Sequence, residues 1–205
     1  MFHNNSQLKP YSKSFLSLGF GLVELLVSIS IVLLVTSIIM ARHGSYNGAV
    51  LLRSQAYEVA LLAREVQLSA VSAVGDGTGD YRNVYGLYFN TASGNFYYTF
   101  RDANDDMFFD ATEQVGARNN IDSRFEIDAI RLVDGSGAEL SSETTLSIIF
   151  QRPNFDAMFY DGANSPAASN VSAVEIDVRT KGSTGDGVGA VRTVEITRTG
   201  QIIVQ

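Results

Sequence analysis

The chain has 205 residues, a formal net charge of −7 and no cysteine, and these properties already exclude several classes of site. Without cysteine there is no disulfide framework, no thiolate metal centre and no cysteine nucleophile. The negative net charge is unlike that of general nucleic-acid binders, which carry a basic face. The length suits one domain with an appendage, and 18 glycines against 3 prolines favour the many tight turns of a β-rich domain.

The N-terminal part of the sequence has the pattern of a membrane segment. Residues 1–19 form a leader that contains Lys9 and Lys13 and no acidic residue. An apolar run follows from Phe20 to Ala41, and about 20 apolar residues are enough for a helix to cross a bilayer. The positive leader predicts that the N-terminus stays in the cytoplasm and that the rest of the chain lies outside it.

Glu24 is the one acidic residue within this apolar run. A carboxylate in hydrocarbon costs about 2.5–3.5 kcal/mol on insertion scales, so such a residue usually has a partner. The alternative is that Glu24 reaches the membrane surface, because it lies only a few residues inside the run.

The segment Gly19–Ser28, GFGLVELLVS, closely resembles the class III signal of type IV pilins and type II secretion pseudopilins. The family pattern is Gly, then Phe, then three mostly apolar positions, then Glu. Gly21 departs from this pattern, because Thr is frequent at its position. The resemblance implies that a prepilin peptidase cuts between Gly19 and Phe20 and that the new amine of Phe20 is methylated. It also implies that Glu24 pairs with the N-terminal amine of a neighbouring subunit, which gives this carboxylate a partner.

After the membrane segment the pattern becomes that of an amphipathic helix. Apolar residues recur at steps of three and four until the glycine-rich stretch Gly75–Asp80 ends the pattern. The sequence therefore predicts one helix from Phe20 to Val74, transmembrane over residues 20–43 and amphipathic over residues 44–74. The apolar stripe consists of Leu52, Ala56, Val59, Leu62, Val66, Ala70 and Ala73.

The remainder, residues 75–205, has the short alternating segments and glycine-rich turns of a globular β-rich head. The expected fold class is α+β, with the long N-terminal helix packed on a mainly antiparallel β-sheet, and the pilin resemblance implies the same layout. Residues 150–157 (FQRPNFDA) and 198–204 (RTGQIIV) also resemble minor pseudopilins of the H type. The predicted strands are Tyr85–Phe89, Asn95–Arg101, Arg124–Val133, Thr144–Phe150, Asp156–Asp161, Val171–Thr180 and Ala190–Val204.

The stretch Asp102–Glu113, DANDDMFFDATE, fits the spacing of a twelve-residue EF-hand calcium loop. Its sixth position, usually Gly, is Met107, which resists a positive φ, and its flanks are predicted strands rather than helices. Some pilins and pseudopilins carry calcium in loops of their β region; the alternative is a solvated acidic loop. The predicted Ca²⁺ ligands are Asp102, Asn104, Asp106, the carbonyl of Phe108, Asp110 and Glu113.

No pattern in the sequence predicts an enzyme. A cut after Gly19 would leave His43 as the only histidine, at the membrane edge, so a Ser-His-Asp triad or a His-based zinc site is not expected in the head. The chain also lacks a P-loop and a dinucleotide-binding glycine motif.

We therefore expect a structural subunit, minor rather than major, of a type IV pilus or type II secretion pseudopilus. Its expected partners are prepilin peptidase, other pilin or pseudopilin subunits and the bacterial inner membrane, which it crosses once before entering a filament. One alternative is a tip pilin that captures DNA or another substrate, with DNA contacted by Arg192 and Arg198. The other is a plain membrane-anchored β domain.

Overall fold

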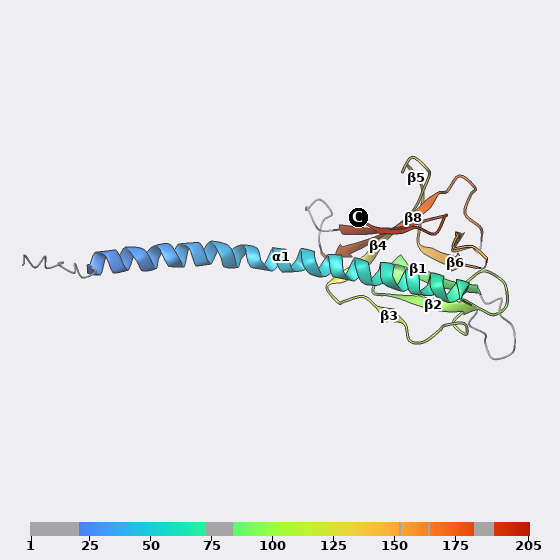
Figure 1. The fold of residues 1–205 in the computed structure, drawn as a ribbon, viewed down its shortest axis with the longest axis horizontal. Helices are drawn as coiled ribbons and strands as arrows, with labels where there is room; N and C mark the ends of the chain where they lie inside the picture. The colour runs from blue at the N-terminus through green and yellow to red at the C-terminus, as the bar shows by residue number, and fades with distance from the viewer. Residues whose placement is uncertain (1–20, 73–83, 152, 164, 183–190) are drawn as a thin grey trace, which may run out of the picture. The chain divides into compact units, whose positions relative to one another are not determined.

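The computed structural model describes residues 21–72, 84–151, 153–163, 165–182 and 191–205. The protein is α+β, with one long helix near the N-terminus and antiparallel sheets after it (Figure 1). It divides into two units, Met1–Gly44 and Ser45–Gln205.

The helix α1 runs over Leu22–Val71. Its helical hydrogen bonding continues through Gly48, although glycine costs about 1 kcal/mol relative to alanine inside a helix. The first described residues, Leu22–Met40, are apolar on all sides, whereas the part within the second unit is striped. The predicted ends of the helix, Phe20 and Val74, lie outside the described residues.

The described residues of the head form two five-stranded antiparallel sheets, where the sequence predicted one mainly antiparallel sheet. Sheet 1 has the order β3-β2-β1-β6-β7, and sheet 2 has the order β10-β9-β8-β4-β5. A short 3₁₀ helix, Thr91–Ser93, joins β1 to β2 in a hairpin. The strands are β1 (Val84–Asn90), β2 (Phe96–Asp102), β3 (Asn119–Asn120), β4 (Phe125–Val133), β5 (Glu139–Glu143), β6 (Thr145–Phe150), β7 (Ala157–Asp161), β8 (Ala173–Thr180), β9 (Val191–Thr197) and β10 (Ile202–Val204).

The main core lies between the striped part of α1 and the inner faces of both sheets (Figure 1). The buried helix face is rich in alanine, and these small side chains let the sheets approach the helix closely. The predicted stripe is confirmed except that Leu62 is only partly buried and Ala73 lies outside the described residues. The buried apolar helix residues are Leu52, Ala56, Val59, Ala60, Ala63, Val66 and Ala70.

The opposite face of sheet 1, here called the outer face, carries a second and smaller apolar cluster. Successive side chains of a strand point to opposite faces, and the strand registers align the outward residues in rows across the sheet. One row consists of Tyr98, Tyr88, Ser147 and Tyr160. The next row consists of Phe100, Gly86, Ile149 and Met158.

Three features of the sheets differ from the sequence prediction. The predicted strand Ala190–Val204 is instead the hairpin of β9 and β10, because Gly200 adopts φ +81° and turns the chain back. The strands β3 and β5 were not predicted, since neither the two residues of β3 nor the sequence ELSSE of β5 alternates between apolar and polar residues.

Candidate functional site

The first part of α1 is the candidate membrane segment. Among the described residues, Leu22–Met40 is the only helical stretch long and apolar enough to cross a membrane, and none of it is buried. At 1.5 Å per residue its 19 residues extend about 28 Å, close to the thickness of a bilayer's hydrocarbon core. Length and composition are therefore compatible with a single-pass membrane anchor.

The hydroxyl groups in this segment are satisfied by the helix itself. Ser28, Ser30, Thr36 and Ser37 each donate a hydrogen bond to the backbone carbonyl four residues earlier, at 2.7–2.8 Å. In hydrocarbon an unpaired donor costs several kcal/mol, and this back-bonding removes that cost for each hydroxyl.

Glu24 differs from these hydroxyl residues. It lies in the first turn of α1 and is exposed, and the described part of the chain offers its carboxylate neither a hydrogen bond nor an ion pair. The helix N-terminus is a favourable place for a negative charge. The backbone N–H of Leu25 cannot serve as the partner of Glu24, because it already donates to the carbonyl of Gly21. The predicted processing residues, Gly19 and Phe20, lie outside the described residues.

The part of α1 in the head also presents an apolar stripe to solvent. Val50, Tyr57, Leu61 and Leu68 recur at steps of seven, four and seven residues and are 47–68% exposed. These steps place them on one side of the helix, away from the buried alanines. An exposed apolar stripe of this kind is typical of a helix that packs against another subunit.

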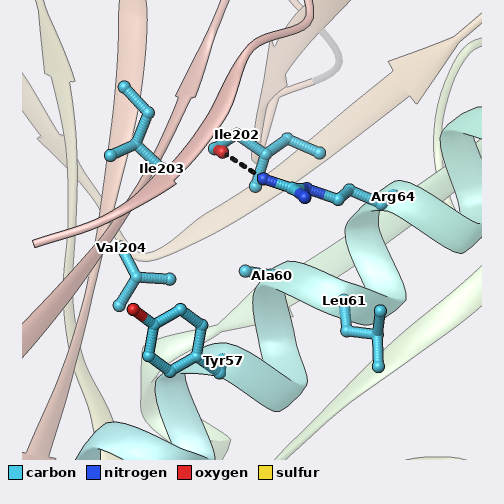
Figure 2. Close-up of a pocket in the computed structure, with 7 residues that line it drawn as sticks. All are labelled: Tyr57, Ala60, Leu61, Arg64, Ile202, Ile203 and Val204. Carbon is cyan, nitrogen blue, oxygen red and sulfur yellow. Dashed lines mark hydrogen bonds between the residues drawn. The ribbon is translucent and has the colours of Figure 1, made fainter.

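A groove lies beside this stripe, where α1 meets the C-terminal strand β10. Figure 2 shows Tyr57 and Leu61 on the helix and Ile203 and Val204 on the strand. The Arg64 guanidinium donates a hydrogen bond to the backbone carbonyl of Ile202 at 3.0 Å (Figure 2). This bond covers one carbonyl on the free edge of β10 and fixes the last strand to the helix.

The second candidate site is the loop that follows β2. The structure brings together three of its predicted ligands: the carboxylate oxygens of Asp102, Asp106 and Glu113 lie within 4.8 Å of one another. Asp102 and Glu113 are buried, whereas Asp106 is exposed. The predicted ligand Asp110 is not among these converging carboxylates. The predicted ligand Asn104 lies beside them, where its side-chain amide donates a hydrogen bond to the Asp106 carboxylate at 2.9 Å.

Backbone N–H groups hold the buried carboxylates in place. Glu113 accepts hydrogen bonds from Ala103 at 2.8 Å and from Asp110 at 3.3 Å, and one oxygen of Asp102 accepts from Met107 at 2.9 Å. The other oxygen of Asp102, Oδ1, is buried and has no hydrogen-bond partner in the described structure. A buried carboxylate oxygen without a donor is costly, and a cation is one way to remove that cost.

The loop backbone adopts the positive φ that the sequence argued against. Met107 has φ +62° and Asp105 has φ +59°, both in the left-handed region that non-glycine residues rarely enter. Met107 therefore adopts the conformation that the sequence predicted it would resist, at a cost in backbone strain. Its side chain is partly buried against the outer-face cluster, and this packing opposes the strain.

The two arginines considered for DNA binding do not form an open cationic face. Arg192 shares its side of β9 with the buried residues Val194 and Ile196, and Arg198 follows just after the strand. Each is partly buried and donates to a backbone carbonyl, Arg192 to Val191 at 3.2 Å and Arg198 to Ala168 at 3.0 Å.

Sheet 2 carries an ion-pair network that the sequence did not reveal. Arg131 on β4 contacts Glu175 and Asp177, both on β8, and Asp177 also accepts a 2.7 Å hydrogen bond from Thr193 on β9. Burial by itself lowers the pKa of Arg131, but the hydrogen bonds to Asp177 and Glu175 raise that pKa above its ordinary value. Because the network joins three adjacent strands across one face, we interpret it as structural.

No protein-family model matches this chain, and no curated protein or solved structure matches it either. Its function is therefore inferred from the helix, the loop and the sheet faces themselves.

Proposed function

We propose that this protein is a subunit, minor rather than major, of a pilin-like filament anchored in a bacterial inner membrane: a type IV pilus or a type II secretion pseudopilus. Prepilin peptidase removes residues 1–19, and the helix that begins at Phe20 anchors the subunit and later packs in the filament. The head is outside the cytoplasm.

The unpartnered carboxylate of Glu24 is the observation that supports this proposal most directly. In the apolar segment the four bonded hydroxyl residues are satisfied within the helix, whereas the Glu24 carboxylate has no partner in the described part of the chain. A cation from another molecule would satisfy it, and the amine of Phe20 in a neighbouring subunit is such a cation. Breaking a buried ion pair of this kind costs several kcal/mol, so the pair would fix the position of one subunit against the next.

The exposed stripe of Val50, Tyr57, Leu61 and Leu68 supports the same proposal. It gives the head-bound part of α1 an apolar face for a second helix, beyond the part that a membrane would cover. An α+β layout with an apolar N-terminal helix and antiparallel sheets is compatible with a pilin-like subunit.

Mass spectrometry of the mature N-terminus tests the processing step. The full chain is produced in membranes with and without a prepilin peptidase, and we expect a start at methylated Phe20 only when the peptidase is present. An uncut Met1, or a cut beyond Ala41, would instead support a plain membrane-anchored or secreted β domain.

Variants of Glu24 test the assembly step separately. Glu24→Gln keeps the size of the side chain but removes its charge, so we expect processing to continue and incorporation into filaments to fall at least tenfold. Ser28→Ala is the matched control, because it removes a polar group on the same helix face whose bond is internal. Equal incorporation of Glu24→Gln and the parent would contradict the pairing.

We further propose that the loop Asp102–Glu113 binds Ca²⁺. The unpartnered Oδ1 of Asp102, a residue only 5% exposed, supports a cation at the point where the carboxylates of Asp106 and Glu113 also converge. Hard oxygen ligands of this kind suit Ca²⁺, and the Phe108 carbonyl and water would complete six or seven ligands.

Isothermal titration calorimetry of the full chain in detergent tests this site. We expect calcium-binding heat in the parent and none in Asp106→Ala, which removes an exposed ligand at little cost to folding. Asp156→Ala, at an exposed aspartate outside the loop, is the control and should bind like the parent. Absence of heat in the parent, or equal heats in the parent and Asp106→Ala, would exclude this site.

A further inference from the structure

The loop after β2 sends its side chains in two directions. Asp106 joins the carboxylate cluster with Asp102 and Glu113, whereas Met107 and Phe109 pack against the outer-face cluster of sheet 1. The same short segment therefore contributes both to the proposed cation site and to the cover of an apolar sheet face.

Phe109 lies across two tyrosines of the outer face. Its ring is stacked on Tyr88 with centroids 4.8 Å apart and planes 22° apart, and on Tyr98 with centroids 4.8 Å apart and planes 18° apart. It also meets the edge of Phe100 at 5.6 Å, and the neighbouring Phe108 meets Tyr88 at 6.1 Å. Aromatic pairs of this geometry contribute about 0.5–1.5 kcal/mol each beyond the area that they bury.

The backbone between the carboxylates and Phe109 is not in a relaxed conformation. Asp105 and Met107 both have positive φ, and a non-glycine residue held there costs of order 1–3 kcal/mol. The convergence of three carboxylates adds repulsion when no cation is present. Without a cation, the aromatic stacking of Phe109 has to oppose both of these costs.

We propose that Ca²⁺ binding by this loop and the docking of Phe109 on Tyr88 and Tyr98 are one linked equilibrium. The cation then controls whether these two tyrosines of the outer face are covered. With Ca²⁺ bound, the loop closes and Phe109 covers the two tyrosines; without it, the loop opens and Tyr88 and Tyr98 become exposed. This inference rests on the calcium site proposed above.

The linkage is reciprocal. The free energy by which Ca²⁺ binding favours the closed loop equals the free energy by which Phe109 docking favours Ca²⁺ binding. Loss of the two ring stacks should therefore weaken Ca²⁺ binding although neither ring supplies a ligand. From the usual range of coupling between two sites, we expect an effect of about tenfold on the dissociation constant.

A double-mutant cycle measured on Ca²⁺ affinity tests the linkage. The full chain in detergent is titrated with Ca²⁺ by calorimetry as parent, Phe109→Ala, Tyr98→Ala and the double variant. We expect each single variant to bind about tenfold more weakly and the double variant to bind no more weakly than Phe109→Ala alone. Phe155→Ala, which removes an exposed phenylalanine of another loop, is the control and should bind like the parent.

Near-ultraviolet circular dichroism reports on the rings directly, because the chain has no tryptophan and its tyrosines dominate the signal. We expect Ca²⁺ to change the tyrosine band of the parent but not that of Phe109→Ala at saturating Ca²⁺. If Phe109→Ala does not fold by far-ultraviolet dichroism, Phe109→Leu takes its place under the same criteria.

The outcomes separate the two proposals. Ca²⁺ binding that is equal in the parent and Phe109→Ala, or that leaves the tyrosine band of the parent unchanged, would overturn the linkage and leave the calcium site standing. No Ca²⁺ binding by the parent would overturn both.

Discussion

The side-chain amide of Gln67 donates a hydrogen bond to the backbone carbonyl of Phe155 at 2.8 Å, and a second to that of Gly200 at 2.9 Å. Gln67 is a buried polar residue on α1, and with these bonds it fixes two loops that lie far from it in the sequence. It is one of the contacts that hold the helix against the C-terminal hairpin.

Gln67→Ala should lower the free energy of unfolding by about 1–3 kcal/mol, because two carbonyls lose their donor. Chemical denaturation of the full chain in detergent measures this change. The exposed Gln201 provides the matched control, since its side-chain amide makes no hydrogen bond to any described residue. Equal stability of the two variants would show that the Gln67 bonds contribute nothing.

Gly200 and Gly137 offer a matched pair for separating backbone strain from close approach. Both have φ near +80°, but a Cβ on Gly200 would meet the carbonyl oxygen of Phe155, whereas a Cβ on Gly137 would meet nothing within 4 Å. Gly137→Ala should cost about 1 kcal/mol from strain alone, and Gly200→Ala should cost at least about 2 kcal/mol more. Thermal denaturation measures the stability lost in each variant. Equal losses would contradict the clash expected between a Cβ at Gly200 and the carbonyl of Phe155.

Acid should destabilise the head in part through Asp122. The side-chain and backbone hydrogen bonds from Arg124 lower the pKa of Asp122 well below its usual range. Because the folded pKa lies below the unfolded one, this contribution is present above the unfolded pKa of about 4 and is lost as the pH falls from there towards the folded pKa.

Unfolding measured between pH 7 and pH 2 tests this contribution. Asp122→Asn and Arg124→Met should each give a shallower acid dependence than the parent, and the double variant should match either single one, because the two residues act as a pair. If the stability of both single variants falls with pH as it does in the parent, Asp122 does not contribute to acid destabilisation.

The DNA-capture alternative makes its own prediction. If Arg192 and Arg198 formed a DNA-binding surface, Arg192→Ala with Arg198→Ala would weaken DNA binding while filaments still form. Since both guanidinium groups donate to backbone carbonyls, we expect DNA binding to change less than twofold. Fluorescence anisotropy with labelled duplex DNA at low salt measures it, and a tenfold loss would revive the alternative.

Much of the fold could be predicted from local patterns. The three- and four-residue steps of Leu52, Ala56 and Val59 define the buried helix face, and alternation defines strands such as β8, because both signals depend only on neighbouring residues. The spacing of Asp102, Asp106 and Glu113 likewise predicted their convergence.

What the sequence did not reveal depends on distant contacts. The positive φ of Met107 is tolerated because its side chain packs on another part of sheet 1, and no local pattern shows that. The stacking of Phe109 on Tyr88 and the two bonds of Gln67 also join residues remote in sequence. The separation into two sheets depends on such contacts too, since β1 pairs with β6 and β4 pairs with β8.

The bond from Arg64 to Ile202 has a consequence for the order in which the protein is made. It joins α1 to β10 across 138 residues of sequence. Contacts of such high sequence separation form slowly, and the buried face of the helix is fully covered only after β10 has been synthesised. Until then the nascent chain exposes part of its future core, so loss of the short strand β10 would affect biosynthesis more than its length suggests.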